Sequence, residues 1–132
     1  MLLHPAGSRP SSRPNADYFT GDVWMDPVIS AAAPARLNAV MVRFDPGART
    51  AWHTHPFGQT LYVVAGQGLI CRRGEAPQII RPGDTVWFEP GEEHWHGAAP
   101  DTGMTHLAMQ EKDASDSAAT WLEKVSDADY AA

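Results

Sequence analysis

The sequence predicts an all-β barrel with a short helix near its C-terminus. Short apolar runs recur from residue 38 onward, and Gly and Pro separate them at regular intervals, as in β-barrels and sandwiches. Five of the six histidines lie in or beside these runs. Only the last part of the chain has apolar residues at helical spacing. The runs define the fold class, and the histidines indicate where the function lies.

The chain is short enough for one domain. Its 132 residues and 14.4 kDa fit a single hydrophobic core, and a hydrophobic fraction of 43% favours folding over disorder. Residues 1–16 are rich in Ser and Pro and show no periodicity. We therefore expect a mobile N-terminal arm over residues 1–16 and a single domain over residues 17–132.

Seven runs read as strands because they are short, apolar and bounded by turn sequences. Gly supplies a positive φ and Pro presets φ in the turns at residues 45–47, 65–68, 81–84 and 89–91. The expected strands are residues 38–44, 60–65, 68–72, 78–80, 85–88, 94–97 and 104–110.

A helix is expected only after Ser117, which is a suitable N-cap. Ala118, Trp121, Leu122 and Val125 follow at helical spacing and would form one apolar side. We expect this helix to pack outside the barrel.

Charge and cysteine content exclude several classes of function. A net charge of −6 and a pI near 5.4 argue against nucleic acid and anionic lipid as partners, so a small molecule is favoured. Cys71 is the only cysteine, which fits a reducing compartment. No apolar run approaches the ~20 residues of a membrane span, and the first residues lack the apolar core of a signal peptide. We expect a cytoplasmic protein.

The histidines fall on shared faces, because side chains two apart on a strand point the same way. His53 and His55 share a face, His94 and His96 share another, and His106 lies on the last expected strand. Each imidazole could simply form a local hydrogen bond. Several imidazoles converging in a dry barrel are costly unless their lone pairs are used, and a divalent transition metal would use them.

The spacing of these residues resembles the two motifs of the cupin superfamily, whose fold is a double-stranded β-helix or jelly-roll barrel. The second motif departs from the pattern, since Glu89 stands where Pro is usual, Pro90 comes one place later, and Ala98 replaces the usual Asn. In the first motif Gln59 stands where Glu is usual. The positions that match are Gly47, His53, His55, Gly66, Gly83, Gly91 and His94.

From Tyr18 to Tyr130 the chain is similar to the bacterial manganese-dependent cupin hydroxynitrile lyases, which cleave and form (R)-cyanohydrins such as mandelonitrile. This resemblance implies one divalent metal per chain, with Mn favoured and Fe, Zn, Ni or Co as alternatives. It also implies a homodimer or higher homo-oligomer, and His106 as the general base. The implied metal ligands are His53, His55, Gln59 and His94.

Gln59 is the informative ligand, because its amide oxygen is neutral where the usual Glu is anionic. The metal would keep its full positive charge and act as a stronger Lewis acid, which favours stabilisation of an alkoxide over activation of oxygen. The alternative is that water takes the place of Gln59 at the metal.

Further inward positions are expected to form the substrate pocket. His96 shares the face of His94, so it is a second candidate base or a structural hydrogen-bonding residue. Thr50 and Gln110 could hydrogen-bond an oxygen or nitrile. An apolar wall that suits an aldehyde, or ordinary barrel filling, is expected from Val40, Val42, Phe44 and Leu61.

Two other functions fit the same residues. A small Fe or Mn cupin dioxygenase could use the same ligands if substrate and oxygen both bound the metal. A cupin without catalytic activity could bind a small acid or sugar, although this leaves His106 without a role. Turnover of mandelonitrile without oxygen would separate the lyase from both.

Overall fold

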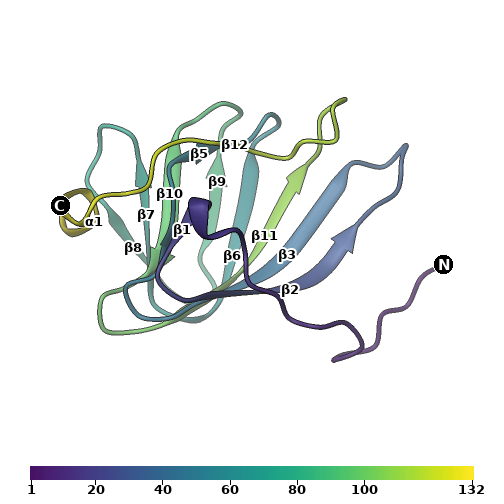
Figure 1. The fold of residues 1–132 in the computed structure, drawn as a ribbon, viewed down its shortest axis with the longest axis horizontal. Coiled ribbons are helices and arrows are strands. Elements are labelled where there is room, and N and C mark those ends of the chain that lie inside the picture. Colours follow the sequence, from purple (N-terminus) through teal and green to yellow (C-terminus); the bar gives the residue numbers. More distant parts are fainter.

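Two antiparallel sheets pack face to face in the computed structural model, which describes residues 1–132. Figure 1 shows them curled around a common interior, with the C-terminal segment, in yellow, running along one edge. The larger sheet contains β1 (Phe19–Thr20), β4 (Arg49–Thr50), β5 (His53–Thr54), β7 (Gly68–Arg72), β8 (Gln78–Ile80), β10 (His94–Ala98) and β12 (Thr120–Trp121). The smaller sheet has the order β2 (Val23–Ser30), β3 (Leu37–Phe44), β11 (Met104–Glu111), β6 (Gln59–Gly66) and β9 (Thr85–Phe88).

The expected strands are confirmed, each within one residue at either end. Their limits were predictable because turns that contain Gly or Pro flank them. The sequence did not predict β2, which contains Pro27. Proline lacks the N–H that a central strand needs, but β2 is an edge strand and its register shifts between Pro27 and Ile29.

The position of the expected helix is wrong. Residues 118–125 do not form a helix: Thr120–Trp121 is the strand β12, and the α-helix α1 lies later, at Asp127–Ala131 with Ser126 as N-cap. Trp121 and Val125 are four residues apart, a spacing that fits one side of a helix and also one face of a strand. Backbone pairing decides for the strand, since Leu122 N donates to Trp52 O at 2.8 Å and Trp52 N donates to Glu123 O at 2.9 Å.

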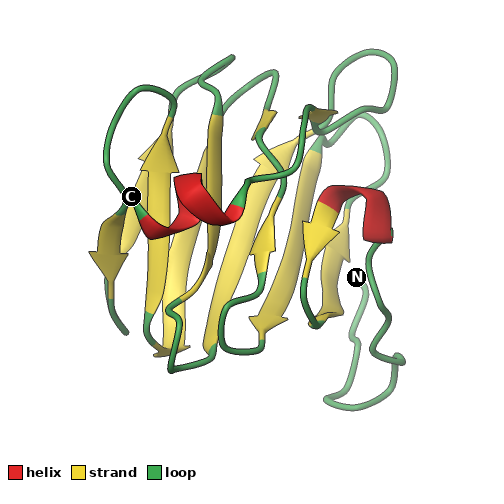
Figure 2. Cartoon of the chain, turned by 60° about the vertical axis from the view of Figure 1, so that its left-hand side comes forward, coloured by secondary structure: helices red, strands yellow, loops and turns green.

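The C-terminal segment and the N-terminal segment both lie against the sheets. Figure 2 shows α1 across the outer face of the larger sheet, where the hydroxyl of Tyr130 donates to Ala98 O at 2.6 Å. Near the other end of the chain, Ser12 forms an antiparallel bridge with Met25 of β2. A short 3-10 helix at Ala16–Tyr18 leads into β1. The structure contains no helix with the length and apolar character that a membrane-spanning helix requires.

Candidate metal centre

One row of inward side chains crosses the larger sheet at the ends of its strands. His94 on β10 lies directly across from His53 on β5, and His53 lies directly across from Trp121 on β12. Their rings are in contact, with centroids 4.3 Å apart for the two histidines and 4.6 Å apart for His53 and Trp121. Strand register, and not proximity in the sequence, brings these three rings together.

A second row crosses the smaller sheet and is made of amides. Gln110 on β11 lies directly across from Gln59 on β6 and from Asn38 on β3. Gln59 Oε1 lies 3.2 Å from His94 Nε2, so the two rows meet inside the barrel. The ring of Phe88, the cross-strand partner of Gln59, stacks on His94 with centroids 3.6 Å apart. The predicted Gln59 therefore stands beside the predicted histidines.

Three of the histidines are held in the same way. The Nδ1 atoms of His53, His55 and His94 each face a main-chain carbonyl oxygen, of Ala51 at 2.9 Å, Ala118 at 2.6 Å and Glu92 at 2.8 Å. Since a carbonyl only accepts, each Nδ1 carries the proton and each Nε2 keeps its lone pair. This outer hydrogen bond is the usual arrangement for a histidine that ligates a metal.

His96 and His106 form a separate pair one step deeper in the barrel. His96 Nδ1 lies 2.9 Å from His106 Nε2, and both side chains are buried. His96 Nε2 and His106 Nδ1 have no hydrogen-bond partner, and neither does His55 Nε2. Buried nitrogens without partners are costly, so this region holds polar atoms that a ligand would satisfy.

Burial determines the charge of the site. Desolvation lowers the pKa of all five histidines, to about 3 for His94 and about 4 for His106. The neighbouring imidazoles lower the pKa of His53 and His96 further, because positive charges repel. The cluster is therefore neutral near pH 7, which is the form of histidine that binds metals.

A cavity of about 330 Å³ opens on this cluster. Its volume lies near the lower end of the ~300–1,000 Å³ typical of small-molecule pockets. Most residues predicted for the site line it, but Leu61 packs in the core with Phe88 and Ala108, and His94 and His106 are not among the lining residues. The predicted residues that line the cavity are Val40, Val42, Phe44, Thr50, His53, His55, Gln59, His96 and Gln110.

Other residues that line the cavity were not expected from the sequence. Asn38 shares the strand parity of Val40, which is a signal that could have identified it. Trp121 and Ala118 could not be found in this way, because the segment that carries them was expected to form a helix outside the barrel. The lining residues not predicted are Phe19, Met25, Asn38, Ala108, Ala118, Ala119 and Trp121.

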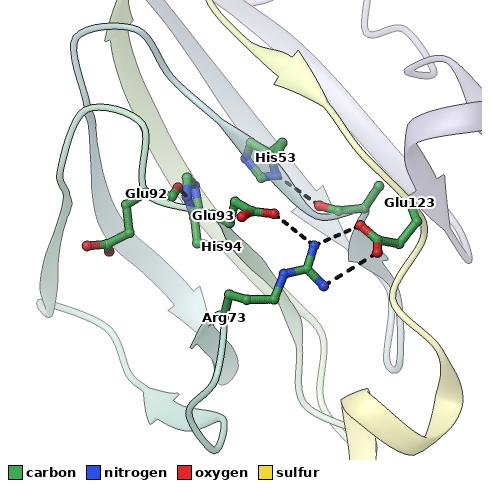
Figure 3. A network of polar contacts seen from close by, with 7 residues as sticks. His53, Arg73, Glu92, Glu93, His94 and Glu123 are labelled. Carbon is green, nitrogen blue, oxygen red and sulfur yellow. Dashed lines mark hydrogen bonds and ion pairs between the residues drawn. The ribbon is translucent and has the colours of Figure 1, made fainter.

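An arginine outside the barrel links the segments that carry the histidines. Figure 3 shows the carboxylates of Glu93 and Glu123 pointing toward the guanidinium of Arg73, at 3.0 Å and 2.8 Å. The same guanidinium lies 4.0 Å from the ring centroid of Trp52. Glu93 precedes His94 in the chain and Trp52 precedes His53, so Arg73 braces both histidine-bearing segments from outside.

The residues present fit a divalent transition metal. The side-chain nitrogens of His53, His94 and His96 all lie within 4.8 Å of one another, and a fourth nitrogen, His55 Nε2, is buried without a partner. Neutral imidazole with an amide oxygen suits borderline ions such as Mn, Fe, Ni, Co and Zn. Hydrogen bonding separates the four histidines, since Nδ1 of His96 faces another imidazole while those of the other three face carbonyls.

Comparison with known proteins identifies relatives along the whole chain. The sequence profile of the cupin domain family matches residues 40–109, which is more than half of the chain. An (R)-mandelonitrile lyase from Granulicella tundricola is 54% identical over 130 residues, covering 98% of each chain. Both expectations drawn from sequence, the cupin fold and the resemblance to hydroxynitrile lyases, are confirmed.

Solved structures show the same fold. A cupin-like protein from Thermotoga maritima is 38% identical and superposes with a TM-score of 0.84, covering 90% of each chain. The DMSP lyase DddQ from Ruegeria pomeroyi is 24% identical with a TM-score of 0.63, covering 91% of this chain and 59% of that one. The second likeness concerns the fold alone.

Proposed function

The chain belongs to the cupin domain family, and from this premise we propose that it is a metal-dependent hydroxynitrile lyase acting on (R)-cyanohydrins such as mandelonitrile. One observation carries the proposal: a cluster of neutral imidazoles opens on a small, largely apolar cavity. It does so in a chain with a close relative named for that reaction. Cleavage gives an aldehyde and HCN.

We assign the metal to His53, His55, Gln59 and His94, with Mn favoured and Fe, Zn, Ni or Co as alternatives. The three histidines share the Nδ1-to-carbonyl bond that leaves Nε2 free to ligate. A divalent ion bound there supplies a Lewis acid that lowers the pKa of a hydroxyl group. His96, whose Nδ1 faces His106, is left for proton transfer.

The histidine pair provides the base. The substrate hydroxyl gives its proton to His96 Nε2, a nitrogen without a partner on a side chain that lines the cavity, while the Nδ1 proton of His96 passes to His106 Nε2 across 2.9 Å. His106 is thus the final base, reached through His96. The bond between the carbinol and nitrile carbons breaks, its electron pair leaves with cyanide, and the oxygen becomes the carbonyl of the aldehyde. The same proton returns to cyanide as HCN leaves.

The cavity wall suits the hydrocarbon part of such a substrate. Val40, Val42 and Phe44 alternate on β3 and face the cavity from one side, with Trp121 on another. Thr50 supplies a hydroxyl, although that oxygen also accepts from His96 N at 3.3 Å. An aryl or alkyl aldehyde would bury its apolar surface against these side chains.

The test is HCN release from racemic mandelonitrile, without oxygen, by metal-loaded wild type, by metal-stripped protein and by His106→Ala. We expect about one transition metal per chain and no turnover after stripping. His106→Ala should retain metal and lose about 10²–10⁴-fold in rate, the usual contribution of a general base. His4→Ala removes an exposed histidine that does not line the cavity and is the matched control.

These measurements test the lyase activity and the assigned base separately. Loaded wild type that releases no HCN above background would exclude the lyase. Turnover that requires oxygen would favour a dioxygenase, and tight binding of a small acid or sugar without turnover would favour a ligand-binding protein. Full activity of His106→Ala would leave the lyase standing but remove His106 as its base.

A further inference from the structure

The three amides of the second row form a hydrogen-bonded chain that ends at the proposed metal ligand Gln59. Gln59 Nε2 donates to Gln110 Oε1 at 2.9 Å. Gln110 Nε2 donates to Asn38 Oδ1 at 2.6 Å and to the main-chain Asn38 O at 3.2 Å. Gln59 and Gln110 are buried. The chain therefore connects β3, β11 and β6 inside the barrel.

One end of this chain fixes the direction of every amide in it. The main-chain oxygen of Asn38 can only accept, so the end of the Gln110 amide beside it must be the NH₂ group. The oxygen of Gln110 then faces Gln59, and the atom of Gln59 beside that oxygen must also be NH₂. Gln59 Oε1 is left on the other side, 3.2 Å from His94 Nε2.

The geometry points to Gln110 as a positioning residue that presents the carbonyl oxygen of Gln59 to the metal, a role that rests on the proposed metal centre. An unrestrained glutamine could turn its NH₂ group inward, where it would repel a cation and bind nothing. Turning Gln59 over here would place its oxygen against Gln110 Oε1, and turning Gln110 as well would place the Gln110 oxygen against the main-chain oxygen of Asn38. Each such mismatch leaves buried polar groups unpaired.

In this role, both N–H groups of the Gln110 amide are used. Both hydrogens of its Nε2 are directed at Asn38, and its Oε1 accepts from Gln59. No N–H of Gln110 remains to donate to a nitrile or carbonyl, although its side chain lines the cavity. The substrate contact expected for Gln110 from the sequence is thereby replaced by a contact with a ligand residue.

The experiment measures metal binding and not turnover. Mn²⁺ and Co²⁺ are titrated into stripped wild type, Gln110→Leu, Gln59→Leu and the double variant, with Gln78→Leu on exposed β8 as the matched substitution. Loss of a residue that orients a ligand typically weakens metal binding by about 10–100-fold. We expect that loss in Gln110→Leu, no change in Gln78→Leu, and no additional effect of Gln110→Leu once Gln59 is Leu.

The visible absorption of bound Co²⁺ supplies a readout that a purely structural role would not change. Its bands depend on the ligands, so Gln110→Leu should shift them toward those of Gln59→Leu. Asn38→Ala keeps the main-chain oxygen and should weaken binding less than Gln110→Leu does. Should Gln110→Leu not fold, Gln110→Met, with its unbranched side chain, replaces it.

The inference fails if Gln110→Leu binds metal as tightly as wild type, or if it weakens binding equally with and without Gln59. An unchanged Co²⁺ spectrum would also exclude it. Wild type that binds no metal would exclude both the metal centre and this role. Wild type that binds metal but releases no HCN would overturn only the proposed function, and the amide chain would stand.

Discussion

The buried Arg49 should be essential for holding the C-terminal segment on the barrel. Its Nη2 donates to Val125 O at 2.9 Å and to Asp127 Oδ1 at 2.8 Å, and its Nη1 donates to Gly47 O at 3.3 Å. Its guanidinium also lies 4.5 Å from the ring centroid of Tyr130. Arg49→Met keeps most of the apolar stem and removes all of these contacts.

The size of the effect follows from burial. Hydrogen bonds from a charged group contribute about 1.5–3 kcal/mol each, and a cation–π contact contributes about 0.5–2 kcal/mol. Part of this is offset in the wild type, since Arg49 Nε is buried without a partner, a situation that costs about 1–3 kcal/mol. Asp127 is exposed and adds little. We expect Arg49→Met to lower the free energy of unfolding by about 2–4 kcal/mol.

Urea unfolding followed by tryptophan fluorescence measures this change. Arg43→Met is the control, because Arg43 pairs with Asp26 where both side chains are partly exposed, and pairs near the surface contribute about 0–1 kcal/mol. A change below about 1 kcal/mol in Arg49→Met would refute the reasoning, as would equal losses in the two variants. The segment also carries Ala118, whose oxygen holds His55, so metal binding should weaken together with stability.

Two further predictions concern groups around the site. Arg73→Met should weaken metal binding several-fold in an isothermal titration, whereas Arg13→Met should not. Of these two arginines, only Arg73 contacts the residues next to His53 and His94. Equal metal affinities of Arg73→Met and wild type would show that the contacts of Arg73 are not needed. Burial raises the pKa of the Cys71 thiol, so its thiolate is disfavoured in the folded protein. Cys71 should react with Ellman's reagent at pH 8 only after unfolding in urea, and rapid full reaction of the folded protein would contradict this.

The sequence predicts the strands well because each is bounded by local signals. Gly and Pro at the turns need no knowledge of the partner strand, so the seven expected strands have nearly their observed limits. Parity also placed His53 and His55 on one face, and the structure brings both to one cavity. These features are encoded within a few neighbouring residues.

What the sequence does not reveal depends on contacts between distant segments. The path of residues 118–125 depends on backbone hydrogen bonds to Trp52, about half the chain away. The spacing of apolar residues within the segment is compatible with both a helix and a strand. The pairing of Gln59 with Gln110 likewise depends on the register of β6 against β11. Alternation within a strand shows which of its side chains share a face, but it does not identify the residues that they oppose on another strand.

The register of β6 against β11 positions residues of the site, and it is interrupted at one point. The pairing of β6 with β11 shifts between Thr105 and His106, at a β-bulge beside the histidine pair. On one side of the bulge the strands run in regular register through Gln59 and Gln110, which the amide chain requires. Bulges increase the local twist and redirect side chains next to active sites. The bulge can therefore orient His106 toward His96 while the amide row and the metal ligands retain the regular sheet geometry.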